Sequence, residues 1–392
     1  MLLTRRSAVL GLPAAVALGR ASLAVAAAPT QRRLVVVILR GALDGMAAVV
    51  PYGDPALARL RGAIVPPAPG KPDGLLDLGG FYGLHPALTG LHETFRAGEL
   101  TILHAVAGPY RVRSHFEAQD MLESGADRPM TSGWLNRAVS VLPAGPAKPE
   151  GDAMAFGVEV PLLLRGPARA GSWAPARLGH ASPDFYTQVA ALAASDRLIG
   201  PAVRQGLSDR GFSAAVMGEE KPAGRDGFAT LTTAAGEMLA RADGPRVAAL
   251  ELDGWDTHVA QPARLTAMLR RLDAGLMALR TALGPAWGQT AILCITEFGR
   301  TVRVNGTRGT DHGTGSVALL LGGAVAGGKV RADWPGLGPG QLLDARDLRP
   351  TADLRAVAKG VLAGHMGIRA ASLGAVFPDS ATAPPMAGLI RA

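Results

Sequence analysis

The fold of this chain is most clearly encoded between Val247 and Thr296, in VAALELDGWDTHVAQPARLTAMLRRLDAGLMALRTALGPAWGQTAILCIT. The segment begins and ends with short apolar runs that lack the alternation of a half-exposed strand, which is typical of buried parallel strands. Leucines between them recur at spacings of four and three, namely Leu265, Leu269, Leu272, Leu276, Leu279 and Leu283. This spacing predicts an amphipathic helix that ends at Gly284 and Pro285. A strand, a helix and a strand predict a parallel βαβ unit with a right-handed crossover.

Other apolar runs extend this prediction along the chain. We predict further parallel strands at Leu34–Leu39, Leu100–Val106 and Val317–Leu321, and a late helix within Asp353–Gly367. Residues 143–224 are rich in Pro, Gly and Ala and show no convincing series of buried strands, so we interpret them as an inserted cap, with a linker region as the alternative. We therefore expect one α/β domain over residues 29–392, with a mostly parallel central sheet, helices on both faces and an inserted cap.

The first 28 residues predict export. Arg5 and Arg6 precede an apolar stretch, and the small residues of Ala24–Ala28 follow like a signal-peptidase site. A membrane anchor is the weaker interpretation, because Arg20 ends the apolar run well short of the roughly 20 residues that a spanning helix needs. We expect residues 1–28 to be a twin-arginine signal peptide, with the twin-arginine translocase as partner during export, and a periplasmic mature chain without a stable membrane anchor.

Composition excludes several other classes of function. The net charge of +8 includes three arginines of the leader, so the mature chain carries +5. Its basic residues are scattered and form no stripe or known motif, so we expect no nucleic-acid partner. The single cysteine, Cys294, cannot form an internal disulfide, and its apolar surroundings predict a buried packing role.

Polar residues gather where the predicted strands end, which is where open parallel sheets bind their ligands. Carboxylates, imidazoles and one serine stand at these positions: Asp44, Ser114, Asp256, His258, Glu297, Asp311 and His312. Carboxylates and imidazoles are ligands that suit zinc and similar divalent ions. We therefore expect Asp44, Ser114, Asp256, Glu297 and His312 to share the carboxyl edge of the sheet, within roughly 12 Å of one another.

Each of these residues also has a structural explanation. Asp44 beside a glycine could form a turn, and Asp256 could cap a helix. Ser114 and Glu117 fit the S-x-x-E capping box at the start of a helix. His312 is the hardest to explain structurally, because the surrounding glycines indicate a close approach of the backbone to another group.

Five ordered motifs, LRGALDG, RSHFEAQD, LDGWDTH, ITEFGRT and GTDHGTGS, cover almost the whole mature chain. They resemble the family called domain of unknown function 1501, bacterial proteins that often carry twin-arginine leaders. The order of acids, serine and histidines at successive strand ends also resembles the alkaline phosphatase superfamily, which includes sulfatases. The resemblance implies an alkaline phosphatase-like fold.

The resemblance further implies a metal-dependent hydrolase of phosphate or sulfate monoesters, acting on a small-molecule or polymer ester. Ser114 would be the nucleophile, and Arg113 and Arg300 would bind the substrate. The implied metal ligands are Asp44, Asp256, His258, Glu297, Asp311 and His312. The implied cofactor is one or two divalent ions, zinc before calcium, magnesium or manganese.

Departures from the superfamily pattern keep alternatives open. Phe298 follows Glu297 where a histidine is usual, and Asp256 and His258 lie two residues apart instead of four. Glu297 could also simply pair with Arg300. A single-metal enzyme and a catalytically degenerate binding or assembly protein are therefore alternatives. A metal-free serine hydrolase is a third, although the chain lacks the G-x-S-x-G elbow.

Overall fold

The structure is a computed structural model that describes residues 31–143, 152–175 and 227–392, with a few single positions between 191 and 207. The expected signal peptide lies outside the described residues, and so does most of the expected cap. Both therefore stay predictions. Within the described ranges, no helix is both long and apolar enough to cross a membrane.

A nine-stranded sheet forms the centre of the described chain, in the order β11-β5-β10-β9-β1-β8-β6-β7, with β12 also paired to β5. Its strands are β1 Arg33–Arg40, β5 Leu100–Ala107, β6 Ala153–Phe156, β7 Ala170–Trp173, β8 Val247–Asp253, β9 Thr290–Ile295, β10 Ser316–Leu321, β11 Lys329–Arg331 and β12 Ala352–Asp353. A small second sheet contains β2 Val49–Val50, β3 Leu76–Asp77 and β4 Gly83–Leu84. All five runs predicted to be strands belong to the central sheet.

The direction of β10 differs from the prediction. β1 is parallel to both β8 and β9, but β10 is antiparallel to β9 and to β5. An apolar run reports burial on both faces of a sheet and carries no information about strand direction, so the parallel prediction for Val317–Leu321 was wrong. The reversal places the beginning of β10 at the edge where β1, β5, β8 and β9 end. The loop that precedes β10 is thereby brought to the carboxyl edge of the sheet.

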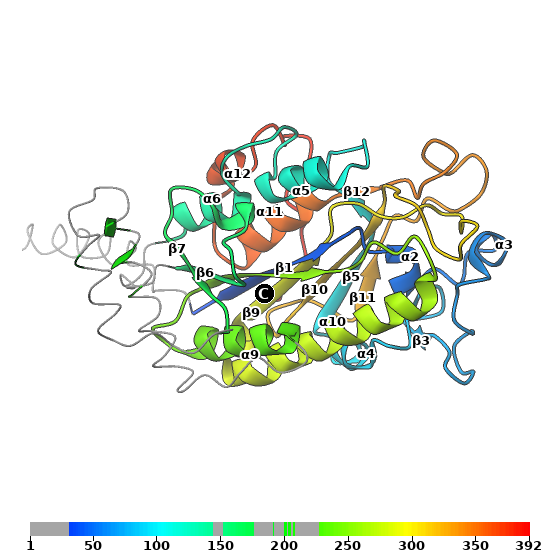
Figure 1. The fold of residues 1–392 in the computed structure, drawn as a ribbon, viewed down its shortest axis with the longest axis horizontal. Helices are drawn as coiled ribbons and strands as arrows, with labels where there is room; N and C mark the ends of the chain where they lie inside the picture. Colours follow the sequence, from blue (N-terminus) through cyan, green and yellow to red (C-terminus); the bar gives the residue numbers. More distant parts are fainter. Residues whose placement is uncertain are drawn as a thin grey trace, which may run out of the picture.

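Helices cover both faces of the sheet, as predicted (Figure 1). Alternate residues of β1 enter two separate cores: Val35, Val37 and Leu39 pack with α4, α9 and α10, while Leu34, Val36 and Ile38 pack with α5, α6, α11 and α12. The helices are α2 Gly45–Ala48, α3 Leu57–Arg61, α4 Thr89–Arg96, α5 His115–Ser124, α6 Trp134–Ser140, α9 Gly227–Ala240, α10 Gln261–Leu283, α11 Leu354–Gly364 and α12 Ala370–Val376, with 3₁₀ turns η1 Leu162–Leu164 and η2 Gly284–Gln289. The mostly parallel α/β fold class is confirmed.

The predicted βαβ unit consists of β8, α10 and β9. All six leucines of its helix are buried. α10 ends at Leu283, and the next residue, Gly284, has a φ of 50°, which suits a residue without a side chain. In the sheet, β1 lies between β8 and β9. The loop after β8 and the loop after β1 are therefore neighbours at the carboxyl edge.

Part of the segment expected to be a cap belongs to the sheet. β6 pairs in parallel with β8, and β7 pairs in parallel with β6. The sequence showed no convincing series of buried strands there, because these two four-residue strands are too short to show a period; β6 is buried throughout, and β7 is partly exposed. The cap interpretation of the remaining positions lies outside the described residues.

Candidate metal centre

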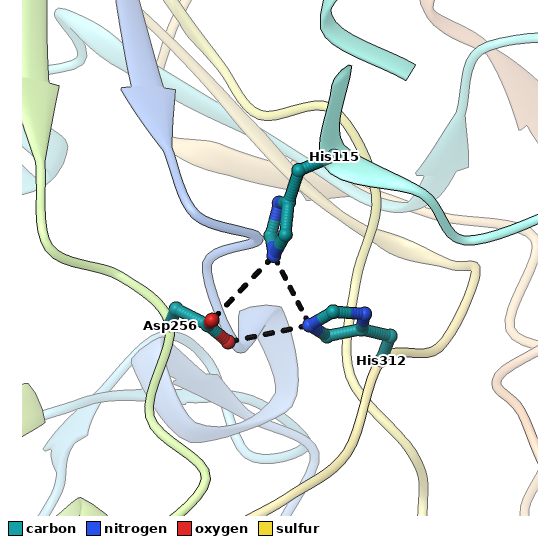
Figure 2. Close-up of side chains that lie close together, drawn as sticks. All are labelled: His115, Asp256 and His312. Carbon is teal, nitrogen blue, oxygen red and sulfur yellow. Dashed lines mark hydrogen bonds and ion pairs between the residues drawn. The ribbon is translucent and has the colours of Figure 1, made fainter. Parts of the chain in front are cut away.

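Three side chains from distant parts of the chain point toward one another at the carboxyl edge of the sheet (Figure 2). His115 is the first residue of α5, Asp256 follows β8, and His312 precedes β10. The distance from His115 Nε2 to His312 Nε2 is 3.0 Å, and His312 Nε2 lies 3.3 Å from Asp256 Oδ1. His115 Nε2 lies 3.6 Å from Asp256 Oδ2. These three residues offer a group of atoms that could hold a metal ion.

His258 adds a fourth side chain to this group. Its Nε2 lies 3.0 Å from His312 Nε2 and 3.0 Å from Asp256 Oδ1. Zinc–nitrogen bonds near 2.0 Å place the corners of a tetrahedron about 3.3 Å apart. The three contacts among His115, Asp256 and His312 span 3.0–3.6 Å, close to this spacing. His258 lies beside His312 and Asp256 at the edge of this group.

The Nδ1 atom of each histidine has an acceptor of its own. His115 Nδ1 lies 2.8 Å from Glu297 Oε1, His258 Nδ1 lies 3.1 Å from Asp311 Oδ1, and His312 Nδ1 lies 3.1 Å from the carbonyl oxygen of Arg113. This pairing assigns the ring proton to Nδ1, so each Nε2 presents a lone pair to the centre. Lone pairs 3.0 Å apart repel each other, and a bound cation would remove this repulsion.

The charges around the centre favour a cation. Burial opposes the charged form of Glu297, but hydrogen bonds from His115 and Gln119 outweigh it and lower the pKa of its carboxyl to about 2. Burial likewise opposes the charged form of Asp256, and Arg300 lowers its pKa nonetheless. Burial, aided by the charges of His115 and Arg300, lowers the pKa of His312. Charged carboxylates and a neutral imidazole are the forms that bind metal ions.

Glu297 was expected to be a metal ligand, but the structure places its carboxylate behind His115, on the side of the ring away from the cluster. Its Oε1 accepts hydrogen bonds from the Gly41 amide and from the side chains of His115 and Gln119, at 2.8–3.0 Å. Its Oε2 accepts one from Thr296. Glu297 therefore orients His115 and has no oxygen directed at the centre. Asp311 has the same relation to His258, with Asn305 as a second donor.

Asp44 is not part of the cluster, which corrects its expected role as a ligand. Its carboxylate is fully buried and forms an ion pair with Arg61, in which Oδ1 and Oδ2 each accept a hydrogen bond. Gln261 Nε2 donates a further bond of 2.6 Å to Oδ2, and the Ala47 amide bonds to Oδ1 as a cap of α2. Both oxygens are thus occupied by protein donors.

The two arginines expected to bind substrate have other partners. Arg300 is fully buried, and it donates to the carbonyl oxygens of Gly41, Ala42, Trp255 and Thr310 and to Asp256. It therefore joins the loops after β1 and β8 to the loop before β10. The guanidinium of Arg113 pairs with Asp344 and Asp347. Both guanidinium groups are thus engaged within the protein, and their expected role in substrate binding stays a prediction.

Ser114 occupies the N-cap position of α5, but its side chain makes no capping hydrogen bond. The capping-box interpretation is therefore wrong, because the hydrogen bond from a backbone amide of α5 to the Ser114 hydroxyl is not formed. The residue is half-buried, and it lies between Arg113, whose carbonyl oxygen holds His312, and the cluster residue His115. Ser114 is thus the chain neighbour of two residues that contribute to the cluster.

The glycines around His312 allow a close approach to the protein's own backbone. A Cβ atom on Gly309 would lie 2.0 Å from the carbonyl oxygen of His258, and one on Gly313 would lie 2.4 Å from the backbone of Arg300. The close approach expected from the sequence is thus between loops of the site itself.

The sequence interpretation missed His115. It stands within the RSHFEAQD motif, where Ser114 was taken as a candidate nucleophile and as a helix cap, and His115 was given no role. The available signal was its position: a histidine directly after a candidate nucleophile, behind the second predicted strand.

Fold and site together define a mostly parallel α/β protein with a histidine–carboxylate cluster at the carboxyl edge of its sheet. A family model described as "Protein of unknown function (DUF1501)" matches residues 103–377. The chain belongs to this family. A search of curated proteins found no match.

Solved structures with a distant likeness were also found. Ps i-CgsB in complex with k-i-k-neocarrahexaose is 12% identical, with 86% of this chain and 72% of that chain covered and a TM-score of 0.41. The phosphonate monoester hydrolase of Agrobacterium radiobacter is 9% identical, covering 86% and 74%, with a TM-score of 0.34. The C-terminal periplasmic domain of EcEptC from Escherichia coli, in complex with Zn, is 9% identical, covering 75% and 73%, with a TM-score of 0.32.

Proposed function

We propose that this protein is a metal-dependent hydrolase of phosphate or sulfate monoesters that acts in the periplasm. The observation that carries the proposal is the convergence of His115, Asp256 and His312 at the carboxyl edge, with His258 beside the last two. Hard-to-hydrolyse esters need charge stabilisation in the transition state, and a metal centre supplies it. The expected signal peptide supports the location.

The residues of the site divide the work as follows. A divalent ion, zinc by the chemistry of its ligands, supplies Lewis-acid charge when bound by His115, Asp256, His258 and His312. Glu297 and Asp311 hold two of the imidazoles in the ligating tautomer. The Ser114 hydroxyl, beside His115, attacks phosphorus or sulfur, the alcohol leaves, and water then hydrolyses the serine ester.

The alternative is a metal-binding relative without catalysis. Asp44, Arg113 and Arg300, which would bind a second metal or the substrate, are all engaged by partners within the protein. A centre with one metal and few free cations fits a binding or assembly role as well as hydrolysis. Hydrolysis of an ester is therefore the property that separates the two candidates.

The test combines metal analysis with a panel of aryl phosphates and sulfates on the full exported chain. We expect turnover that a chelator abolishes and zinc restores. His312→Ala should lose metal and activity, whereas His92→Ala should keep both, because His92 lies on α4 and its ring contacts the Asp77 carbonyl oxygen, away from the cluster. Metal binding without turnover of any ester would favour the inactive relative. Turnover that survives complete metal removal would refute the proposal in favour of a metal-free serine hydrolase.

A further inference from the structure

A hollow of about 380 Å³ lies at the start of α10, at the carboxyl side of the sheet. Ile64 lines it from the segment after α3 and His85 from the segment after β4. Thr266 and Arg270 line it from α10, and Arg308 from the loop before β10. The volume falls in the range of small-ligand sites, which runs from roughly 300 to 1,000 Å³. The proposed hydrolytic mechanism makes no use of these residues.

The charge of the hollow is positive. Arg270 and Arg308 are both exposed, and within the described residues no hydrogen bond or ion pair engages either guanidinium. Asp73 is the one acidic residue of the described lining, and it forms no ion pair with these arginines. Two free guanidinium groups beside one carboxylate make this surface attractive to an oxyanion, because guanidinium groups bind phosphate and sulfate with paired N–H donors.

The remaining polar lining is already hydrogen-bonded. His85 Nδ1 accepts a hydrogen bond of 3.1 Å from the Ala87 amide, and its Nε2 lies 3.4 Å from the Thr266 hydroxyl. Burial, aided by the charge of Arg270, lowers the pKa of His85 to about 4. The imidazole is therefore neutral at pH 7, and the two arginines alone supply the positive charge.

The hollow and the metal centre share one loop. The carbonyl oxygen of Arg308 accepts a hydrogen bond of 2.9 Å from the Gln261 amide at the start of α10. The next residue, Gly309, packs against the carbonyl oxygen of His258, and Asp311 bonds to the His258 ring. A molecule with one ester at the metal centre could therefore place a second group near Arg308.

We propose that Arg270 and Arg308 form a subsite for a second sulfate or phosphate group, so that the preferred substrate is an ester that carries several such groups. This inference rests on the proposed function for its link to catalysis. The subsite itself binds anions whether or not the metal centre is active.

Calorimetric titration of the full mature protein with low-mass dextran sulfate tests the subsite directly. We expect the double variant Arg270→Gln/Arg308→Gln to bind about tenfold more weakly than the parent. A matched control, Arg96→Gln/Arg369→Gln, removes the same charge from exposed positions elsewhere and should bind as the parent does. Arg270→Lys/Arg308→Lys keeps the charge but removes the paired N–H donors, so its affinity should lie between those of the parent and the glutamine variant. Thermal unfolding checks that all variants are folded.

His312→Ala separates this inference from the proposed hydrolase. Dextran sulfate binding that persists in this variant supports the subsite even if no ester is ever turned over. Equal affinity in the parent and in Arg270→Gln/Arg308→Gln overturns the inference, as does an equal loss in the control pair, which would show general attraction to a basic protein. If the protein is an active hydrolase, the subsite variant should raise KM for a multiply sulfated ester and leave KM for a simple aryl sulfate unchanged.

Discussion

Glu297→Gln is the sharpest test of how the metal centre is built. The substitution keeps the shape of the side chain and removes one charge. The amide oxygen can take the place of Oε1, which accepts from Gly41, His115 and Gln119. The new NH₂ group would face the Thr296 hydroxyl, which also donates to the Leu39 carbonyl oxygen and can accept in return. The packing should therefore survive.

The expected loss is in metal affinity. His115 Nδ1 now donates to a charged carboxylate, and in the variant it donates to a neutral amide, a bond of roughly half the strength. Partners of this kind are typically worth 10- to 100-fold in metal affinity, or about 1.4–2.7 kcal/mol. The free energy of unfolding without metal should change far less than the metal affinity.

Competition with a chromophoric chelator measures the zinc affinity of parent and variant. Glu93→Gln, at an exposed position of α4, is the matched control and should bind zinc as the parent does. Zinc affinity in Glu297→Gln within twofold of the parent would refute the orienting role of Glu297. A variant that unfolds more easily but binds zinc as tightly as the parent would also refute this role.

Three further predictions follow from the same contacts. Asp44→Asn leaves Arg61 buried without its counter-ion, so denaturant unfolding should show a loss of roughly 3–5 kcal/mol, while zinc affinity is retained. Burial lowers the pKa of His104 from 6.5 to about 4. The unfolded chain therefore binds a proton below pH 6.5 that the folded protein does not, so the free energy of unfolding falls between pH 6.5 and 4, by roughly 3 kcal/mol for this residue. In His104→Gln, the free energies of unfolding at pH 8 and pH 5 should differ by less than they do in the parent. Ser114→Ala should abolish turnover and change stability by less than the roughly 0.5–2 kcal/mol of a lost cap, because no capping bond exists; near-normal turnover would exclude Ser114 as the nucleophile.

The longer strands could be predicted from the sequence, because a strand buried on both faces is a continuous apolar run. Such a run is visible without knowledge of the strands that pair with it. The direction of β10 could not, because pairing is decided by the fold around it. β6 and β7 were missed since four residues are too few to show a period. The sheet edge where the side chains cluster followed from the strand ends, and the sequence had placed Asp256, His258 and His312 there.

The roles of individual site residues depended on contacts between distant segments. Arg300 resembles a substrate-binding arginine in the sequence, yet its donors are taken by carbonyl oxygens of neighbouring loops. Asp44 resembles a metal ligand, yet Arg61, seventeen residues further on, neutralises it. His115 is a ligand candidate because its Nε2 atom meets Asp256 and His312 while Glu297 holds its Nδ1 atom. Spacing along the chain cannot reveal these contacts.

X-ray absorption spectroscopy at the zinc edge tests the central claim most directly. The exported protein is used, and the metal content of the same sample is measured. The account predicts one zinc ion per chain, bound through three imidazole nitrogens and carboxylate oxygen at about 2.0–2.1 Å. Zinc should be lost from His115→Ala and from His312→Ala and retained in Asp44→Asn. A protein that binds no divalent metal after export, or whose zinc remains in both histidine variants, would contradict the account.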